Sequence, residues 1–133
     1  MRAKYFIACA TLTAMSGLLS VNAADLSGVW STNVPFCDKI FTKKRTEISF
    51  APNSDIYGTG FIIEGSRIKA KTATCSVKSR KEDGSVTHLM AVCATEIMML
   101  DTQFSMRLVN SDTLERIYPG VPELDSRYGR CRM

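Results

Sequence analysis

A predicted hairpin with one cysteine in each strand constrains the fold most. An Asp-Gly pair ending at Gly84 stands between two runs of high β propensity, and glycine tolerates the positive φ that a tight turn requires. Cys75 and Cys93 each lie nine residues from Gly84. If the loop places Glu82 opposite Val86, the two cysteines face each other across the ladder. The sequence therefore predicts an antiparallel hairpin closed by a Cys75–Cys93 disulfide.

The first 23 residues have the three parts of a secretory signal peptide. A basic start (Arg2 and Lys4) precedes an apolar stretch over residues 5–21, and small residues end at Ala23. Threonine, serine and glycine dilute the apolar stretch, which favours cleavage over an uncleaved membrane anchor. No second apolar span follows. We therefore expect a single domain over residues 24–133, located in the periplasm or secreted.

The expected mature chain is short and nearly neutral. Removing 23 of the 133 residues leaves 110, a length that fits one domain burying roughly 65% of its unfolded surface. Arg2 and Lys4 are removed with the signal peptide, so the mature chain keeps 15 of the 17 basic residues. With 13 acidic residues, its net charge is +2. Such a small excess indicates no particular partner. Nucleic acid is not expected, since few aromatic residues stand among the charges.

Four cysteines remain once Cys9 is removed with the signal peptide. An even number in an exported chain of this size predicts two disulfides, in one of three possible pairings. The hairpin geometry favours Cys75 with Cys93, which leaves Cys37 with Cys131. A four-cysteine zinc site is the alternative, but it lacks the paired C-x-x-C spacing of such sites. We therefore expect no metal and no other cofactor.

The remaining segments predict further strands and almost no helix. Residues 26–32 predict an entry strand, residues 39–50 predict two short strands or one bent ribbon, and residues 103–109 alternate cleanly between apolar and polar side chains. Seven or eight short antiparallel strands joined by tight turns indicate a small all-β barrel, or a sandwich. Closure into a barrel is favoured because an open sheet would leave long unpaired edges.

The segment around residue 65 predicts a second hairpin. Gly65-Ser66 forms a tight turn that would set Ile63 opposite Ile68. Further on, the alternation of polar and apolar residues slips by one position. One extra residue near Thr72, a β-bulge, would restore the inward face.

The beginning of the expected mature chain carries a resemblance to a known family. Residues 24–30 read Ala-Asp-Leu-Ser-Gly-Val-Trp, and residues 37–40 read Cys-Asp-Lys-Ile. This opening resembles that of the small periplasmic lipocalin-like inhibitors of secreted metallopeptidases, which use an L-x-G-x-W strand and then a cysteine on the next strand. The resemblance covers about eleven residues and implies an eight-stranded antiparallel barrel.

The inhibitors of that family act through an extended arm ahead of the first strand. Here, cleavage after Ala23 would leave only Ala24 and Asp25 before Leu26. Each extended residue spans about 3.4 Å, so two residues are too short to enter a peptidase cleft. We therefore expect no inhibition of metallopeptidases by the mature N-terminus.

The residues that usually carry catalysis are sparse. His88 is the one histidine, and no metal-ligand spacing or triad partner is recognisable beside it. Glu82 and Asp83 are adjacent acids at a turn, where solvated side chains are the usual outcome. All four cysteines of the mature chain are assigned to disulfides. We therefore predict no catalytic residues and no enzymatic activity.

Three groups of residues are candidates for binding. The first is the loop of the central hairpin: Arg80, Lys81, Glu82 and Asp83. The Cys75–Cys93 disulfide would stiffen the base of this loop, so that little conformational entropy is lost on binding. The second is a basic face: Arg67, Lys69, Lys71 and Lys78. This face could hold an anionic glycan, a lipid headgroup or an acidic protein. The alternative is a solvated outer surface without a ligand.

The third group is apolar and rich in methionine: Met90, Met98, Met99 and Met106, with Trp30, Phe61 and Phe104. Methionine adapts to irregular shapes, so these side chains could line a ligand-holding lumen. A barrel of this size is more often filled by its own side chains, which makes a plain core the preferred interpretation.

These observations predict an exported, disulfide-bonded, all-β binding module without catalysis of its own. Its expected partner is another protein of the bacterial envelope or the extracellular space, and a hydrolase that it inhibits is one case. A carrier of a small apolar ligand in the barrel lumen is the first alternative. An enzyme with no recognisable motif is the second.

Overall fold

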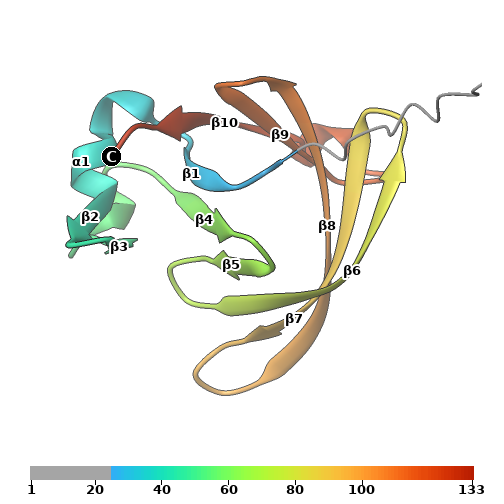
Figure 1. Ribbon diagram of the computed structural model, residues 1–133, viewed down its shortest axis with the longest axis horizontal. Helices are drawn as coiled ribbons and strands as arrows, with labels where there is room; N and C mark the ends of the chain where they lie inside the picture. Colours follow the sequence, from blue (N-terminus) through green and yellow to red (C-terminus); the bar gives the residue numbers. More distant parts are fainter. Residues whose placement is uncertain (1–24) are drawn as a thin grey trace, which may run out of the picture.

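The computed structural model describes residues 25–133, so the predicted signal peptide lies outside the described residues. Within this range, eight antiparallel strands close into a barrel in the order β1-β10-β9-β8-β7-β6-β5-β4 (Figure 1). The all-β barrel predicted from the strand pattern is therefore confirmed. The barrel strands are β1 (Gly28–Ser31), β4 (Gly60–Glu64), β5 (Arg67–Lys69), β6 (Thr74–Asp83), β7 (Val86–Ala94), β8 (Met99–Asn110), β9 (Thr113–Ile117) and β10 (Ser126–Cys131).

A small subdomain between β1 and β4 covers one side of the barrel (Figure 1). It contains a two-stranded sheet, β2 (Phe41–Lys44) and β3 (Glu47–Phe50), and short helical turns: η1 (Val34–Phe36), α1 (Cys37–Ile40) and η2 (Ser54–Ile56). A further turn, η3 (Pro122–Leu124), precedes β10. The two strands expected within residues 39–50 are present, although the first two residues of that range belong to α1. No helix among residues 25–133 is long and apolar enough to cross a membrane.

The central hairpin forms between β6 and β7, with a register that differs from the expected one. Asp83, not Glu82, lies opposite Val86, so the turn has two residues and Gly84 adopts a φ of 60°. The expected register is therefore wrong by one residue at the turn. A bulge between Val77 and Ser79 shifts the register back by one residue. Because of this bulge, the cysteines still meet as predicted.

The predicted hairpin at Gly65-Ser66 is confirmed, since Ile63 lies opposite Ile68 and Gly65 has a φ of 57°. The prediction of a bulge near Thr72 is wrong. The chain instead reverses between β5 and β6, where the N–H of Ala70 donates to the carbonyl of Ala73 at 2.9 Å. A slip in the period-two pattern is produced equally by a bulge and by a short turn, and the local sequence does not distinguish them.

Both predicted disulfides are present. Cys75 and Cys93 lie directly opposite each other, with Cα atoms 3.9 Å apart. Cys37 is joined to Cys131, which ties α1 to the last strand of the barrel. The two bonds therefore hold different parts of the molecule: one lies inside the central hairpin, and the other connects the small subdomain to the C-terminus.

The buried side chains form two clusters. The larger fills the barrel and includes Trp30, Met106 and Leu114, each with no measurable exposure. The smaller lies between the barrel wall and the β2–β3 sheet and includes Ile40 and Phe41. Sheet residues that are buried on the outer side of the barrel, such as Ile62, belong to this second cluster.

Trp30 is fully buried in the larger cluster. Its indole Nε1 donates to the carbonyl of Leu26 at 3.0 Å. The guanidinium of Arg130 lies 4.3 Å from the ring centroid and donates to the carbonyl of Ser27 at 2.9 Å. The first and last strands of the barrel are therefore joined by a cation–π contact as well as by the sheet ladder.

Candidate functional site

The predicted binding loop is split between two faces of the molecule. Its four residues form the end of β6: Arg80, Lys81, Glu82 and Asp83. Arg80 lies opposite Leu89, whose side chain is buried in the barrel, whereas Lys81 lies opposite His88 on the outer face. Since side chains alternate along a strand, Glu82 shares the face of Arg80, and Asp83 shares that of Lys81. The four side chains therefore do not present one common surface.

The disulfide also lies far from this loop. Cys75 and Cys93 are near one end of the β6–β7 ladder, and the Gly84-Ser85 turn closes the other end. Cys93 is only two residues before Thr95, where the β7–β8 turn begins. The covalent bond therefore braces the β5–β6 and β7–β8 turns, and the stiffened loop base expected for Arg80 is absent.

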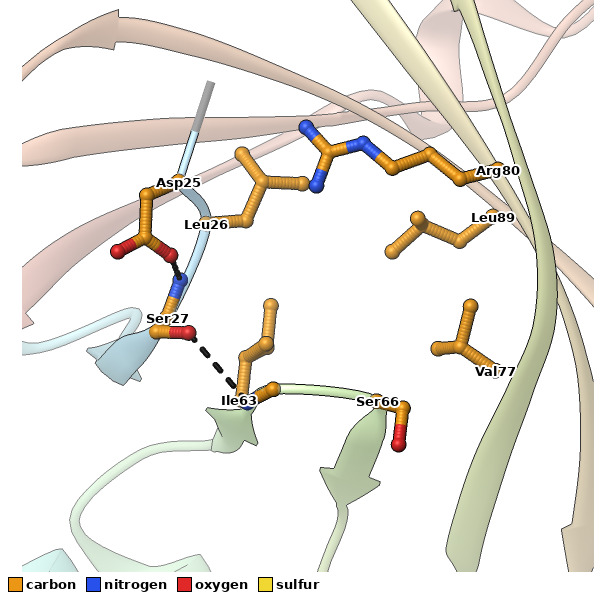
Figure 2. Close-up of a pocket in the computed structure, with 9 residues that line it drawn as sticks. Asp25, Leu26, Ser27, Ile63, Ser66, Val77, Arg80 and Leu89 are labelled. Carbon is orange, nitrogen blue, oxygen red and sulfur yellow. Dashed lines mark hydrogen bonds between the residues drawn. The ribbon is translucent and has the colours of Figure 1, made fainter. Parts of the chain in front are cut away.

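Arg80 lies at the mouth of the barrel, beside the chain entering β1 (Figure 2). A cavity of about 330 Å³, here called the mouth cavity, opens there. Its walls are apolar: Leu26, Ile63, Val77 and Leu89. Its rim is polar and includes Arg80, whose side chain extends from β6 toward Leu26 in Figure 2.

Two carboxylates near the mouth have lowered pKa values. The Nε–H of Arg80 donates to Glu82 at 2.5 Å and the hydroxyl of Thr87 donates at 2.8 Å, and these hydrogen bonds lower the pKa of Glu82. A backbone hydrogen bond of 2.9 Å from Ser27 lowers the pKa of Asp25. Both groups are therefore held in the charged form, which suits a polar rim and not a proton donor at neutral pH.

The predicted basic face is partly neutralised. Lys69 lies 3.8 Å from a carboxylate oxygen of Glu47. Lys71 forms an ion pair with Asp55, and this hydrogen-bonded lysine lowers the pKa of that carboxyl. Of the other two predicted residues, Arg67 points outward from β5 and Lys78 is the extra residue of the β6 bulge. Two of the four positive charges are therefore offset by acidic neighbours.

The structure brings together a polar line that was not predicted from the sequence. His88 Nδ1 lies 2.7 Å from the hydroxyl of Ser105, and Nε2 lies 3.4 Å from a carboxylate oxygen of Asp83. Gln103 donates to the same hydroxyl at 3.1 Å. The residue types match those of a hydrolytic triad, but Ser105 is only 1% exposed. Its oxygen is closed to a substrate carbonyl, so we interpret this line as a structural network.

An exposed apolar feature lies at the turn between β7 and β8 and at the start of β8. Four consecutive apolar residues, here called the β7–β8 tip, are exposed there: Ile97 (87%), Met98 (49%), Met99 (72%) and Leu100 (47%). Figure 1 shows this turn at the end of the long β7–β8 ribbon. The sequence carries a signal for this feature. Residues 97–100 form an unbroken apolar run where polar turn residues are usual.

The tip borders a second hollow of the surface. A cavity of about 500 Å³ lies between the β5–β6 and β7–β8 turns and is lined by Lys71, Thr72, Thr95, Glu96, Ile97 and Met98. Both interpretations of the methionine-rich group, the preferred plain core and the ligand-holding lumen, place it inside the barrel, and both are wrong for three of its four methionines. Met106 is buried in the barrel, whereas Met90, Met98 and Met99 lie on the surface.

No group of three or more His, Cys, Asp or Glu side chains within residues 25–133 is arranged to hold a metal ion. We take the mouth cavity and the β7–β8 tip as the candidate sites of the described residues. Comparison with known proteins found no family model, no curated protein and no solved structure that matches this chain.

Proposed function

We propose that this chain is an exported, non-catalytic binding module that recognises another protein in the bacterial envelope or outside the cell. The observation that supports this proposal most directly is the exposed β7–β8 tip. Contiguous apolar surface on a soluble protein is typical of an interaction site. The two disulfides are typical of an oxidising compartment, which agrees with export.

The tip has the energetic character of a binding anchor. Complete burial of one large aliphatic side chain contributes about 1.5–3 kcal/mol. Within the described chain, the four tip residues leave most of this contribution unused, because nearly half or more of each is exposed. The nearby Cys75–Cys93 bond limits how far the tip can rearrange. A partner that buries the tip would therefore gain apolar contacts at a small entropic cost.

The test compares two pairs of substitutions in the mature, oxidised protein. The tip variant carries Ile97→Ser and Met99→Ser. The control variant carries Ile56→Ser and Leu124→Ser, which remove two exposed apolar side chains elsewhere (74% and 53% exposed). Each protein is immobilised and used for affinity capture from an envelope extract. The captured protein is then purified, and its affinity is measured by calorimetry.

We expect one defined protein to be retained by the wild type and by the control variant, and to be lost with the tip variant. Loss of two large apolar contacts should weaken the measured affinity at least tenfold, since tenfold corresponds to about 1.4 kcal/mol. A partner that binds the tip variant and the wild type equally would contradict the assignment of the tip. Absence of any specific partner would contradict the proposed function.

A secreted hydrolase is one class of partner that the proposal includes. The predicted loop residues Lys81 and Asp83 lie on the outer face, where a partner could contact them. An inhibition panel of metallopeptidases and lysozymes, run with the wild type, the tip variant and a Lys81→Ser/Asp83→Ser variant, separates these surfaces. Inhibition abolished only by the loop substitutions would favour the loop over the tip.

The mouth cavity supports a second candidate function, the transport of a small apolar ligand. Its volume of about 330 Å³ is within the range of small-molecule sites, and its walls are apolar. Native mass spectrometry of the purified mature protein tests this alternative. A stoichiometric adduct that disappears when Leu89→Trp fills the cavity would favour a carrier over a protein-recognition module.

A further inference from the structure

Strand β8 is paired on both sides only at Ser105 and Met106. β7 pairs with β8 from Met99 to Met106, whereas β9 pairs with it from Ser105 to Asn110. No strand among residues 25–133 lies beside residues 99–104 on the side away from β7. At about 3.4 Å per residue, this free edge is about 20 Å long.

The main-chain groups that face the free edge can be assigned from the ladder. The N–H of Thr95 donates to the carbonyl of Met98 at 2.9 Å, which makes this a hydrogen-bonded pair. Hydrogen-bonded and non-hydrogen-bonded pairs alternate in an antiparallel ladder. The N–H and C=O groups of Met99, Asp101 and Gln103 therefore point away from β7. No hydrogen bond from another described segment reaches these groups.

Strand β6, which is also partly free on one side, shows how such an edge is protected. β5 pairs with β6 only from Thr74 to Ser76, so residues 78–83 have no strand on that side within the described chain. Five of these six residues are charged: Lys78, Arg80, Lys81, Glu82 and Asp83. Charged side chains on an edge discourage the addition of another strand.

The edge of β8 lacks this protection. Residues 99–104 contain no proline and no lysine, and Asp101 is their single charge. Met99, Asp101 and Gln103 are exposed on the outer face, and Leu100 is half-exposed on the other face. The carboxylates of Asp101 and of Glu96, the residue just before the tip, form no ion pair with any residue from 25 to 133. The edge is thus apolar at one end and negatively charged beside it.

We propose that an extended segment of the partner protein adds to this edge as a further β-strand, with a lysine or arginine opposite Asp101. This inference rests on the proposed function and specifies how the partner is held. The main chain of Met99, Asp101 and Gln103 would bond to the added strand, and Met99 and Leu100 would pack against its apolar side chains. An opposite charge across the strands contributes to selection of the partner.

The charge of the edge distinguishes this partner from two other occupants. In a symmetric pairing of two copies centred on Asp101, the two carboxylates would lie directly opposite each other, which is destabilising. An anionic lipid surface would be repelled by Glu96 and Asp101 in the same way. A basic, extended peptide segment is the occupant that the charges favour.

The matched variants are Gln103→Pro and Gln103→Ala. Proline removes the N–H that faces the edge while leaving the bonds to β7 intact, and proline is tolerated at such edge positions. Both variants lose the hydrogen bonds of the Gln103 side chain to Ser105 and His88, but alanine keeps the main-chain N–H. A third variant, Asp101→Asn, removes only the charge. Circular dichroism and thermal melting confirm that each variant is folded before binding is measured.

The probe is a phage-displayed library of random twelve-residue peptides, selected on the mature, oxidised protein. We expect selected peptides with alternating apolar residues and at least one lysine or arginine. Gln103→Pro should weaken their binding about tenfold, the effect of one lost hydrogen bond, and Gln103→Ala should change it less than about twofold. On binding, amide hydrogen exchange at Met99, Asp101 and Gln103 should slow.

Several outcomes overturn the proposal. These are a library that yields no binding peptide, peptides that bind Gln103→Pro as tightly as Gln103→Ala, and peptides that leave the three amides unprotected. A dimer in sedimentation that Gln103→Pro abolishes would assign the edge to a second copy. Binding to phosphatidylcholine–phosphatidylglycerol vesicles that Gln103→Pro abolishes would assign it to a membrane.

The envelope capture experiment separates this inference from the proposed function. If Gln103→Pro retains the same protein as the wild type and the tip variant does not, protein recognition holds and strand addition is wrong. If the wild type retains no specific protein, the proposed function itself is wrong.

Discussion

Gly28 and Gly60 are two of the three glycines in barrel strands where an added Cβ atom has no room. A Cβ atom at Gly60 would lie 2.0 Å from the main-chain oxygen of Trp30. A Cβ at Gly28 would lie 2.3 Å from Nη1 of Arg130, the guanidinium that stacks on Trp30. The obstacle at Gly60 is main chain, whereas the obstacle at Gly28 is the end of a flexible side chain. The close approach of β1 to β4 therefore depends more strictly on Gly60.

The first prediction compares Gly60→Ala with Gly65→Ala. The substitution at Gly60 should destabilise the protein by about 3 kcal/mol, because β1 and β4 must move apart to admit the methyl group. Nothing lies within 4 Å of a Cβ at Gly65, whose φ is 57°, so only the left-handed conformation is penalised there; that cost is about 1 kcal/mol. Urea unfolding of the oxidised proteins gives both values. Equal losses would show that β1 and β4 can separate freely.

At the scale of the elements, three adjacent strands are joined across their outer face by one carboxylate. Glu115 of β9 lies opposite Arg107 of β8 and opposite Arg127 of β10. It forms an ion pair with Arg107 and another, at 3.2 Å, with Arg127. The side chain of Glu115 is 10% exposed, whereas those of Arg107 and Arg127 are 40% and 71% exposed. The carboxylate is thus the buried centre of the cluster.

The second prediction is that Glu115→Gln destabilises the protein by about 1–2 kcal/mol, a value reduced because solvent screens both exposed arginines. Arg127→Gln should cost less than about 1 kcal/mol, since Glu115 keeps Arg107 and Arg127 is the more exposed partner. Chemical unfolding at neutral pH and low salt measures both. A larger loss for Arg127→Gln than for Glu115→Gln would contradict this order.

At the scale of the whole molecule, the two disulfides differ in how much of the chain they enclose. Cys37 and Cys131 are separated by 94 positions, and Cys75 and Cys93 by 18. The entropy that a crosslink removes from the unfolded chain grows with the enclosed loop, to about 4.7 kcal/mol for 100 residues against about 3 kcal/mol for 15. The long bond also holds the small subdomain against the barrel.

The third prediction is therefore that Cys37→Ala/Cys131→Ala loses more stability than Cys75→Ala/Cys93→Ala, by about 1–2 kcal/mol. Thermal unfolding of the two double variants under non-reducing conditions provides the comparison. The opposite order would indicate that packing around the buried Cys75–Cys93 bond outweighs the chain-entropy effect.

The features that depend on neighbouring residues could be predicted without the structure. The turns at Gly65 and Gly84 follow from the positive φ that only glycine adopts easily, and their strands follow from alternating side chains. The even number of cysteines and the hairpin between Cys75 and Cys93 then led to both disulfide pairs. These inferences need only local chemistry and the period of a strand.

The surfaces that are available for binding depend on how distant segments pair in the fold. The bulge in β6 shifts the alternation of side chains by one residue, so that Arg80, and not Lys81, shares the face of the buried Leu89. The free edge of β8 exists because β9 ends before it covers residues 99–104. Strand length, register and barrel closure depend on distant segments that pair only in the folded state. The predicted loop was therefore found in the right hairpin. The apolar run of the tip is visible in the sequence, but its exposure and the open edge beside it emerged only from the fold.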